Sequence, residues 1–272
     1  MNTKEFVSKN LGKDKFPGRP IRLNRVSLKP RANKDYAELL FWGDVHLGYP
    51  TSNIGKAKRM LEYALDKKVY VMGMGDYMDA GLRDSVGDSV YRQNLNPQKQ
   101  MEEVEKMLKP LADEGLLVGL ISGNHEFRIT KSTSIDIVKI IAKSLHVPYL
   151  KSAGWSLFSV AGTRYSCYAF HGHSGSRFKH TKLKAVVDTC GWIESDIIAM
   201  GHVHSIAVEP IIKQRFDPAK NKIIKKTQMV ILTGAYLEWD DSYGQSANYP
   251  IPKIGSPKVK LFAGDKKINI SL

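Results

Sequence analysis

The stretch Glu38-Leu39-Leu40-Phe41-Trp42-Gly43-Asp44-Val45-His46 decides the fold class, because an apolar run passes through a glycine directly into side chains that bind metals. A short apolar run bounded by a turn residue is typical of a buried β-strand. In α/β sheets, ligands bind in the crevice beyond the carboxyl ends of such strands. The stretch therefore predicts a buried strand that delivers Asp44 and His46 to the functional edge of a sheet.

Outward from this strand, apolar residues alternate between helical spacing and short strand-like runs. The segments predicted as helices are 54–67, 97–111, 134–145 and 183–187. The segments predicted as strands are 38–42, 69–72, 116–121, 157–160, 164–170, 197–200, 227–232, 258–262 and 267–272. Strands that alternate with helices and are followed by several more strands predict an α/β fold, a two-sheet β-sandwich flanked by helices (αββα).

The chain divides into two parts. Residues 1–37 are basic and interrupted by prolines, which predicts an N-terminal extension without sustained helix or strand. Residues 38–272 are predicted to form one domain, in which 206–272 complete the second sheet and 240–256 form a candidate lid loop. No apolar stretch suits a signal peptide or a membrane span, so we expect a cytoplasmic protein that does not enter membranes.

The charge balance is strongly basic, with 41 Lys and Arg against 27 Asp and Glu and a formal net charge of +14. Such an excess attracts polyanions, although a solvated basic surface is an equal alternative. The two cysteines, Cys167 and Cys190, form no CxxC pattern. This disfavours a disulfide framework or a thiolate zinc site and predicts two buried small residues.

Five short clusters of metal-binding residue types follow predicted strands. They are Asp44-Val45-His46, Gly75-Asp76-Tyr77-Met78-Asp79, Gly123-Asn124-His125-Glu126, His171-Gly172-His173 and Gly201-His202-Val203-His204. Six of the eight histidines lie in them. Imidazole nitrogens with carboxylate and amide oxygens suit divalent ions such as Mn, Fe or Zn, and two ions about 3.5–4 Å apart can hold a phosphate and activate a bound water. Together the clusters predict a phosphate-ester site with two divalent metal ions.

In this order the clusters resemble the calcineurin-like metallophosphoesterases, whose pattern is DxH, GDxxD, GNH[DE], a lone histidine and GHxH. The resemblance covers about residues 39–205. It implies one ion held by Asp44, His46, Asp76 and His204, and a second held by Asp76, Asn124, His171 and His202. It further implies that His125 is a catalytic acid oriented by Asp79. Mn²⁺ is the favoured ion, with Fe, Zn, Ni and Mg as alternatives.

Other assignments stay more open. His171 and His173 both suit the lone-histidine position; His171 is favoured because it directly ends a predicted strand, and His173 is then a substrate-binding candidate. Arg128 and Arg177 are the other substrate-binding candidates. Asp79 is followed by Ala80-Gly81, where the protein Ser/Thr phosphatases of the superfamily have Arg-Gly, so that phosphate-clamping arginine is absent.

The sequence therefore favours a phosphodiesterase that uses a metal-bound hydroxide and acts on nucleic acid or nucleotides. A small-molecule phosphatase or cyclic-nucleotide phosphodiesterase is the first alternative. A non-catalytic nucleic-acid-binding protein is the second. Aromatic residues near the C-terminus can stack on bases or simply pack; they are Tyr236, Trp239, Tyr243 and Tyr249. The sequence does not assign an oligomeric state.

Overall fold

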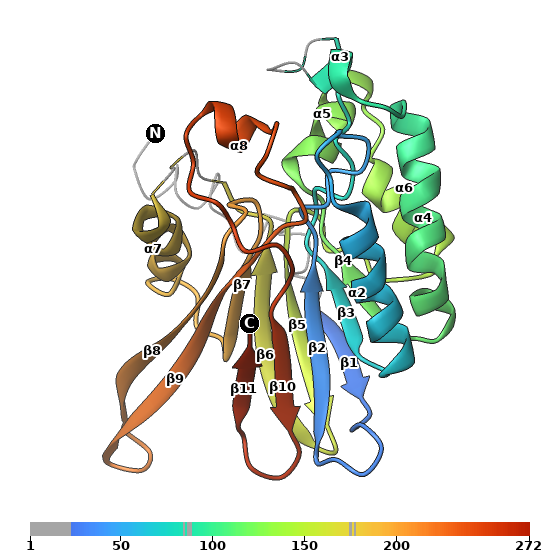
Figure 1. The fold of residues 1–272 in the computed structure, drawn as a ribbon. Coiled ribbons are helices and arrows are strands. Elements are labelled where there is room, and N and C mark those ends of the chain that lie inside the picture. Colours follow the sequence, from blue (N-terminus) through green and yellow to red (C-terminus); the bar gives the residue numbers. More distant parts are fainter. Residues whose placement is uncertain (1–22, 84, 86–88, 174–175, 177) are drawn as a thin grey trace, which may run out of the picture.

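Two β-sheets lie face to face between helices in the computed structural model, which describes residues 23–83, 85, 89–173, 176 and 178–272 (Figure 1). The five-stranded sheet has the order β11 (Ile268–Ser271), β10 (Lys258–Phe262), β2 (Tyr36–Trp42), β3 (Tyr70–Gly73) and β4 (Leu117–Leu120). The six-stranded sheet has the order β1 (Leu23–Leu28), β5 (Ala153–Val160), β6 (Thr163–Phe170), β7 (Ile197–Met200), β9 (Lys222–Thr233) and β8 (Ile206–Asp217). The predicted α/β sandwich is confirmed.

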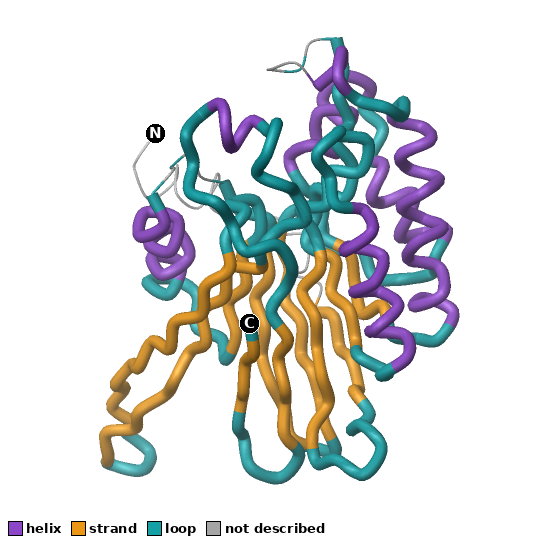
Figure 2. Tube along the Cα trace, in the orientation of Figure 1, coloured by secondary structure: helices purple, strands orange, loops and turns teal. Residues whose placement is uncertain are grey.

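Helices cover both outer faces of the sandwich (Figure 2). Beside the five-stranded sheet lie α2 (Ile54–Asp66), α4 (Pro97–Asp113), α5 (Asn124–Thr133) and α6 (Ile137–Ser144). The six-stranded sheet is covered by α7 (Lys179–Thr189), while the short α3 (Ser89–Arg92) and α8 (Tyr243–Ser246) lie in loops. Helix α2 begins where the Asn53 side chain accepts a hydrogen bond from the Lys56 N–H at 2.8 Å. An N-cap of this kind satisfies one of the donors that a helix start leaves unpaired.

The core is one large apolar cluster to which both sheets contribute. Phe41 of β2, Phe158 of β5 and Ile231 of β9 all belong to it and are fully buried. Burying a side chain of this size stabilises the fold by about 1.5–3 kcal/mol. A smaller cluster joins α7 to the outer face of the six-stranded sheet and contains Cys190. Both cysteines are free and buried, which confirms the prediction made for them.

One sequence prediction in the first half of the chain is wrong, and one helix there was not predicted. Leu23–Leu28 lie inside the predicted extension, yet they form β1, which pairs in parallel with β5. The Asn24 side chain is buried there and donates a hydrogen bond to the Val118 carbonyl at 2.8 Å. Residues 1–22 lie outside the described residues. The helix predicted over 134–145 is found as α6, whereas α5, which Ser134 ends with a left-handed φ of 61°, was not predicted.

Residues 206–272 complete both sheets rather than one. Strands β8 and β9 form a long antiparallel hairpin that extends the six-stranded sheet. Strands β10 and β11 form a second hairpin, which extends the five-stranded sheet. Within the described part of the chain, no helix combines the length and apolar character needed to cross a membrane.

Candidate metal centre

The predicted metal ligands gather at one end of the sandwich. Strands β2, β3 and β4 run parallel, and so do β6 and β7, so their carboxyl ends lie on shared edges of the two sheets. Loops after β2, β3, β6 and β7 carry the first, second, fourth and fifth motifs, while the third begins α5 just after β4. Three groups of side chains there lie close enough to hold a metal ion.

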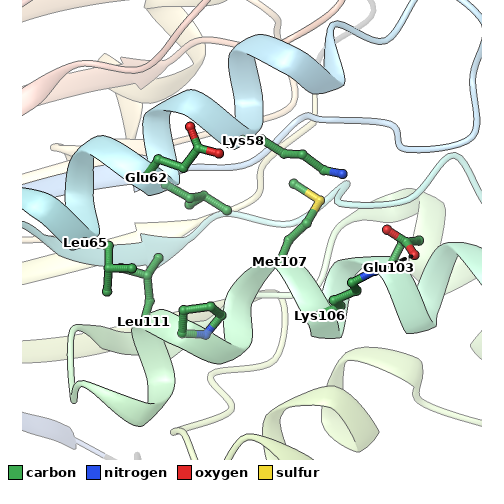
Figure 3. Close-up of a pocket in the computed structure, with 9 residues that line it drawn as sticks. Lys58, Glu62, Leu65, Glu103, Lys106, Met107 and Leu111 are labelled. Atoms are coloured by element: carbon green, nitrogen blue, oxygen red, sulfur yellow. Dashed lines mark ion pairs between the residues drawn. The ribbon is translucent and has the colours of Figure 1, made fainter.

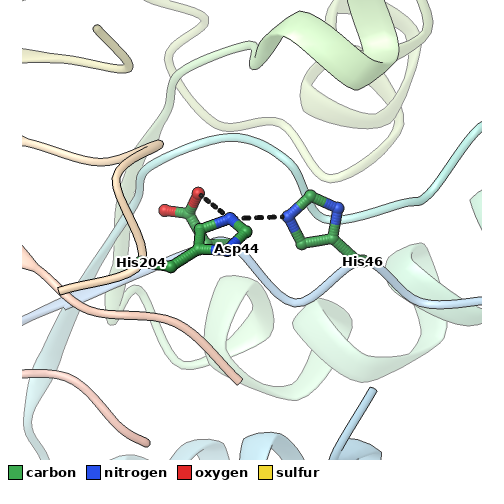
Figure 4. Close-up of side chains that lie close together, drawn as sticks. All are labelled: Asp44, His46 and His204. Carbon is green, nitrogen blue, oxygen red and sulfur yellow. Dashed lines mark hydrogen bonds and ion pairs between the residues drawn. The ribbon is translucent and has the colours of Figure 1, made fainter. Parts of the chain in front are cut away.

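The first group is Asp44, His46 and His204 (Figure 4). The Nε2 atoms of His46 and His204 are 3.0 Å apart, and His204 Nε2 is 3.4 Å from Asp44 Oδ1. Asp44 is fully buried, and its carboxylate accepts a hydrogen bond from the His202 backbone N–H at 3.0 Å. His204 keeps a side-chain exposure of 32%, so this group opens toward solvent at that side.

The second group is Asp76, His171 and His202, joined by Asn124. The Asn124 Oδ1 atom lies 3.0 Å from His171 Nε2 and 2.7 Å from His202 Nδ1. His171 Nδ1 donates to the Met74 carbonyl at 2.8 Å, which points Nε2 into the group. This set of two imidazoles, a carboxylate and an amide comes from three loops and the start of α5; Asp76 and His171 are buried, and His202 and Asn124 are half-buried.

Asp76 connects the groups through one oxygen. Its Oδ2 atom lies 3.2 Å from His171 Nε2, 3.8 Å from His46 Nε2 and 3.9 Å from His125 Nε2. Its other oxygen accepts a hydrogen bond from the His125 backbone N–H at 2.9 Å, at the N-terminus of α5. Helix N-termini favour such an anion. The Asp76 carboxylate is therefore fixed between both groups, which is the position of a bridging ligand.

The third group is His46, Asp79 and His125. His125 Nδ1 lies 2.7 Å from the Asp79 carbonyl oxygen and 3.5 Å from Asp79 Oδ1. The shorter contact shows that the Asp79 backbone, more than its carboxylate, sets the orientation of the His125 ring. Arg128 Nη2 lies 3.1 Å from His125 Nε2 on the other side of the ring.

Glu126 is a scaffold residue of this site to which sequence reasoning gave no role. It is 1% exposed, and its carboxylate accepts four backbone hydrogen bonds at 2.7–3.1 Å. The donors are the N–H groups of Asp76, Tyr77, Met78 and Gly123. Burial, with the Asp76 charge nearby, raises the pKa of Glu126. Its carboxylate ties the loop after β3 to the start of α5.

Five predicted ligands adopt a backbone conformation that residues other than glycine rarely adopt. Their φ angles are positive, between 48° and 67°, for Asp44, His46, Asp76, His202 and His204. A residue in this region costs of order 1–3 kcal/mol and persists where the surrounding structure enforces it. Gly75 takes φ of 88°, and a side chain at Gly123 would collide with the Asp76 carboxylate. Gly75 and Gly123 therefore give the sharp turn and the free space that the Asp76 carboxylate needs.

The family model for calcineurin-like phosphoesterases matches residues 38–222. The chain belongs to this family. No curated protein sequence matches the chain.

Three solved structures resemble the chain distantly. A predicted phosphoesterase from Streptococcus pneumoniae TIGR4 is 12% identical, with 86% of this chain and 88% of that chain covered and a TM-score of 0.38. A metallophosphoesterase from Sphaerobacter thermophilus is 12% identical, with 86% and 87% covered and a TM-score of 0.37. Vps29 complexed with Zn²⁺ from Entamoeba histolytica is 12% identical, with 86% and 97% covered and a TM-score of 0.35.

The imidazoles of the calcineurin-like site have pKa values that are shifted in opposite directions. Burial lowers the pKa of His202 to about 4, with His171 adding to the effect, and burial holds the pKa of His46 well below its usual value. Burial also opposes the charged forms of His171 and Asp76, but each stabilises the other. Their mutual attraction raises the pKa of His171 to about 10 and holds that of Asp76 well below its usual range.

The donor atoms of this phosphoesterase site fit divalent cations. His46 Nε2 lies 3.0 Å from His204 Nε2 and 3.8 Å from Asp76 Oδ2, which in turn lies 3.2 Å from His171 Nε2, so these donor atoms face one another. Metals bind neutral imidazole and ionised carboxylate, so a bound cation would replace the proton that Asp76 favours on His171; the donor set contains no thiolate. The site therefore suits a pair of ions with nitrogen and oxygen ligands.

The predicted substrate-binding residues have mixed outcomes. Arg128 lies beside His125, as its contact shows, while His173 is exposed. Arg177 lies outside the described residues. Tyr236 packs in the core with Trp42 and is fully buried, so it does not stack on bases.

Sequence reasoning also gave no individual role to Lys182, a buried lysine of α7 that contacts Ser205. A lysine at an inward helical position is the signal that could have singled it out.

A surface pocket of about 220 Å³ lies elsewhere, between α2 and α4 (Figure 3). Its floor is apolar, with Leu61, Leu65 and Met107, and charged side chains such as Lys58 and Glu103 form its rim. No residue of the three metal-binding groups lines it. This pocket lies in the helical layer and has no part in the chemistry of the loops.

Proposed function

We propose that the protein is a two-metal phosphoesterase that hydrolyses phosphodiesters of nucleic acid or nucleotides. The observation that carries the proposal is the position of Asp76 Oδ2 within 3.2–3.9 Å of imidazole nitrogens from two other loops and the start of α5. A carboxylate in the middle of a nitrogen-rich cluster is the arrangement needed to bridge two cations. Membership of the calcineurin-like phosphoesterase family supports the same reaction class.

The proposed ligands divide into two sets around Asp76. Asp44, His46 and His204 would hold one ion with Asp76, and the other ion would be held by Asp76 with Asn124, His171 and His202. When bound, the ions would neutralise a phosphate and lower the pKa of a bound water. Mn²⁺ is the proposed ion because the donors are nitrogen and oxygen, although Fe, Zn, Ni and Mg use similar donors.

His125 is proposed to supply the proton that the leaving oxygen needs. Burial opposes its protonation, but Asp76 and Asp79 raise its pKa above the usual value. The Asp79 carbonyl fixes Nδ1, so Nε2, which also contacts Arg128, is the ring nitrogen that would face a phosphate ester. Arg128, 3.1 Å from Nε2, would bind the same phosphate and bring its oxygens to this ring.

The proposal of a nucleic-acid or nucleotide substrate is supported by the net charge of +14. A basic protein neutralises successive phosphates, so binding should weaken as salt increases. The missing arginine after Asp79 argues against a protein phosphatase. We also propose that the protein acts in the cytoplasm, on the basis of its two free cysteines.

The test is hydrolysis by the purified protein with Mn²⁺. Substrates are single- and double-stranded DNA and RNA, bis-p-nitrophenyl phosphate as a diester, and p-nitrophenyl phosphate as a monoester. The proposal expects diesters and at least one nucleic acid to be cleaved. Asp76→Asn should abolish cleavage, whereas Asp113→Asn, an exposed carboxylate paired with Lys109, should not affect it.

Other outcomes would identify the alternatives. Cleavage of monoesters alone would point to a small-molecule phosphatase, and cleavage of cyclic nucleotides alone would point to a cyclic-nucleotide phosphodiesterase. Salt-sensitive nucleic-acid binding without cleavage of any ester, at full metal occupancy, would show a non-catalytic binding protein.

A further inference from the structure

Lys182 is a lysine buried on the inner side of α7, close to the metal centre. It is 8% exposed, although lysine is among the residues least often buried. Its Nζ atom lies 3.4 Å from the hydroxyl of Ser205. Ser205 directly follows the proposed metal ligand His204, so the ammonium group lies beside the loop that completes the first group.

Among the described residues, the partners of this ammonium group are all neutral. Besides the long contact to Ser205, Nζ lies 5.5 Å from the centre of the Tyr249 ring. No carboxylate among the described residues pairs with it; the next lysine along the helix, Lys184, instead pairs with Asp188. Burial lowers the pKa of Lys182, as expected where no anion compensates for lost water.

An ammonium group in this position does not serve the stability of the fold. Burying a charge is unfavourable unless an opposite charge or several hydrogen bonds compensate for the lost hydration. One long hydrogen bond and one aromatic ring compensate only partly. Such a group is expected where a ligand supplies the missing negative charge.

The loop after β9 connects the position of Lys182 to the metal centre. The Tyr236 N–H donates to the Asp44 carbonyl at 3.0 Å, and the Asn53 N–H donates to the Tyr236 carbonyl at 2.7 Å. The same loop continues to Tyr249, whose carbonyl accepts a hydrogen bond from the Trp239 indole at 2.7 Å. The loop therefore holds Tyr249 over Lys182 while it is also fastened to the Asp44 backbone.

We propose that Lys182 binds a second phosphate of the substrate, next to the phosphate that is cleaved. This inference rests on the proposed function and specifies its substrate class as esters that carry two neighbouring phosphates. A nucleoside diphosphate and a polynucleotide both present such a pair. Ser205 and Tyr249 form the neutral walls of this subsite, and the second phosphate supplies the charge that Lys182 lacks.

The test compares one-phosphate and two-phosphate probes that resist hydrolysis. Methylphosphonate and methylenediphosphonate are titrated calorimetrically into the Mn²⁺-loaded protein. Lys182→Met keeps the length of the side chain and removes only the ammonium group. It should weaken methylenediphosphonate binding about tenfold, the effect of one charge-assisted hydrogen bond. Methylphosphonate binding should change by less than about twofold, because exposed or distant charges contribute little.

Two further variants and a second probe sharpen the result. Lys184→Met removes an exposed charge one residue away and should affect both probes by less than about twofold. Lys182→Arg should retain preference for the diphosphonate. The dinucleotide pTpT with both phosphates replaced by phosphorothioates distinguishes the two sources of the second phosphate. If Lys182→Met weakens binding of this dinucleotide, the second phosphate belongs to a neighbouring nucleotide. If the variant weakens binding of methylenediphosphonate alone, the second phosphate belongs to a diphosphate.

The thermal midpoint of unfolding distinguishes a binding role of Lys182 from a structural role. Without ligand, Lys182→Met should melt at the wild-type temperature or higher, because it removes an uncompensated charge. The inference is overturned if the variant melts lower with unchanged binding, if Lys184→Met matches its binding loss, or if the wild-type protein does not bind methylenediphosphonate. Lys182-dependent binding without any ester hydrolysis would refute the proposed function alone, and hydrolysis without Lys182 dependence would refute the subsite alone.

Discussion

Buried carboxylates have different partners at the two ends of the β-sandwich. At the loop end, which carries the predicted metal ligands, the carboxylates of Asp44 and Asp76 are surrounded by imidazoles and no lysine or arginine pairs with them in the described structure. At the turn end, which contains the strand connections 161–162, 194–196 and 263–267, the buried Asp196 carboxylate accepts hydrogen bonds from Ser166 and Lys266 at 2.7–2.8 Å.

Backbone conformation follows the same division. Five proposed ligands at the loop end have left-handed φ angles, whereas at the turn end this conformation occurs in hairpin turns such as Ala161-Gly162 and not at the buried Asp196. The Tyr165 hydroxyl there donates to the Phe262 carbonyl at 2.7 Å and joins the two sheets. The buried charge at the turn end is thus paired within the protein and stabilises the fold. The ligand loops at the loop end are strained, and their buried carboxylates need a bound ligand to compensate for their charge.

The largest expected effect is the loss of catalysis on changing His125 to alanine. Because general acid catalysis contributes about 10²–10⁴-fold, His125→Ala should lower kcat by about 1,000-fold. Metal content should be retained, since His125 is not a proposed ligand. Steady-state kinetics on a phosphodiester measure this effect. His180→Ala, at an exposed ring stacked on Phe178, is the control, and an equal loss in both variants would contradict the assignment.

The next effect is the loss of the scaffold of the loop end. Glu126→Gln replaces one of two accepting oxygens by an NH₂ group that faces backbone donors. The free energy of unfolding should therefore fall by about 3 kcal/mol, as when buried hydrogen bonds to a charged group are lost. Urea denaturation measures it. Glu114→Gln, an exposed residue paired with Lys68, should remain near wild type; if Glu126→Gln does too, the scaffold role is wrong.

At the turn end, Asp196→Asn should lower the free energy of unfolding by about 2 kcal/mol at pH 7, because it removes a buried ionic acceptor. Burial opposes ionisation of Asp196, but Lys266 and Ser166 outweigh it and lower its pKa. The stabilisation is therefore present above the unfolded pKa of about 3.9 and is lost as pH falls through the lower folded pKa. The gap between wild type and variant should close in acid; a gap that is constant or widens in acid would contradict the pairing.

The smallest effect concerns a turn whose strain no function requires. Ala161 and Gly162 connect β5 and β6 with φ angles of 43° and 92°, a turn that favours Asn-Gly. Ala161→Asn should raise the free energy of unfolding by about 0.5–1 kcal/mol, since asparagine tolerates this region better. A thermal melt measures the gain. A fall in melting temperature would show that Ala161 makes a contact that asparagine disrupts.

The fold was predictable where strands are uniformly apolar. Strand β7 coincides with the predicted 197–200, because every residue of Ile197–Met200 is buried. Strand β1 could not be predicted, since Arg25 and Ser27 face solvent and Asn24 is the buried polar residue. Helix α5 lacked apolar periodicity because Glu126 occupies its inner face. The spacing of Gly123 and Glu126, a helix start followed by glutamate, was the signal available for it.

The candidate site was predictable as a set of residues but not as an arrangement. Order and spacing brought out the ligand candidates, because each motif follows a strand. The contact of His125 with the Asp79 backbone rather than its carboxylate depends on the left-handed turns of the loops, which side-chain patterns do not encode. The position of Lys182 depends on how α7 packs near the loop after β7, a contact between distant segments.

Counting bound metal tests the central claim most directly, namely that two cations complete the loop end. Metal-free protein is titrated with Mn²⁺ by calorimetry, and the bound metal is counted by elemental analysis after dialysis. The wild-type protein and Asp113→Asn should each bind two ions per chain, whereas Asp76→Asn should lose at least one. A wild-type chain that binds no Mn²⁺, or a count that Asp76→Asn leaves unchanged, would contradict the account.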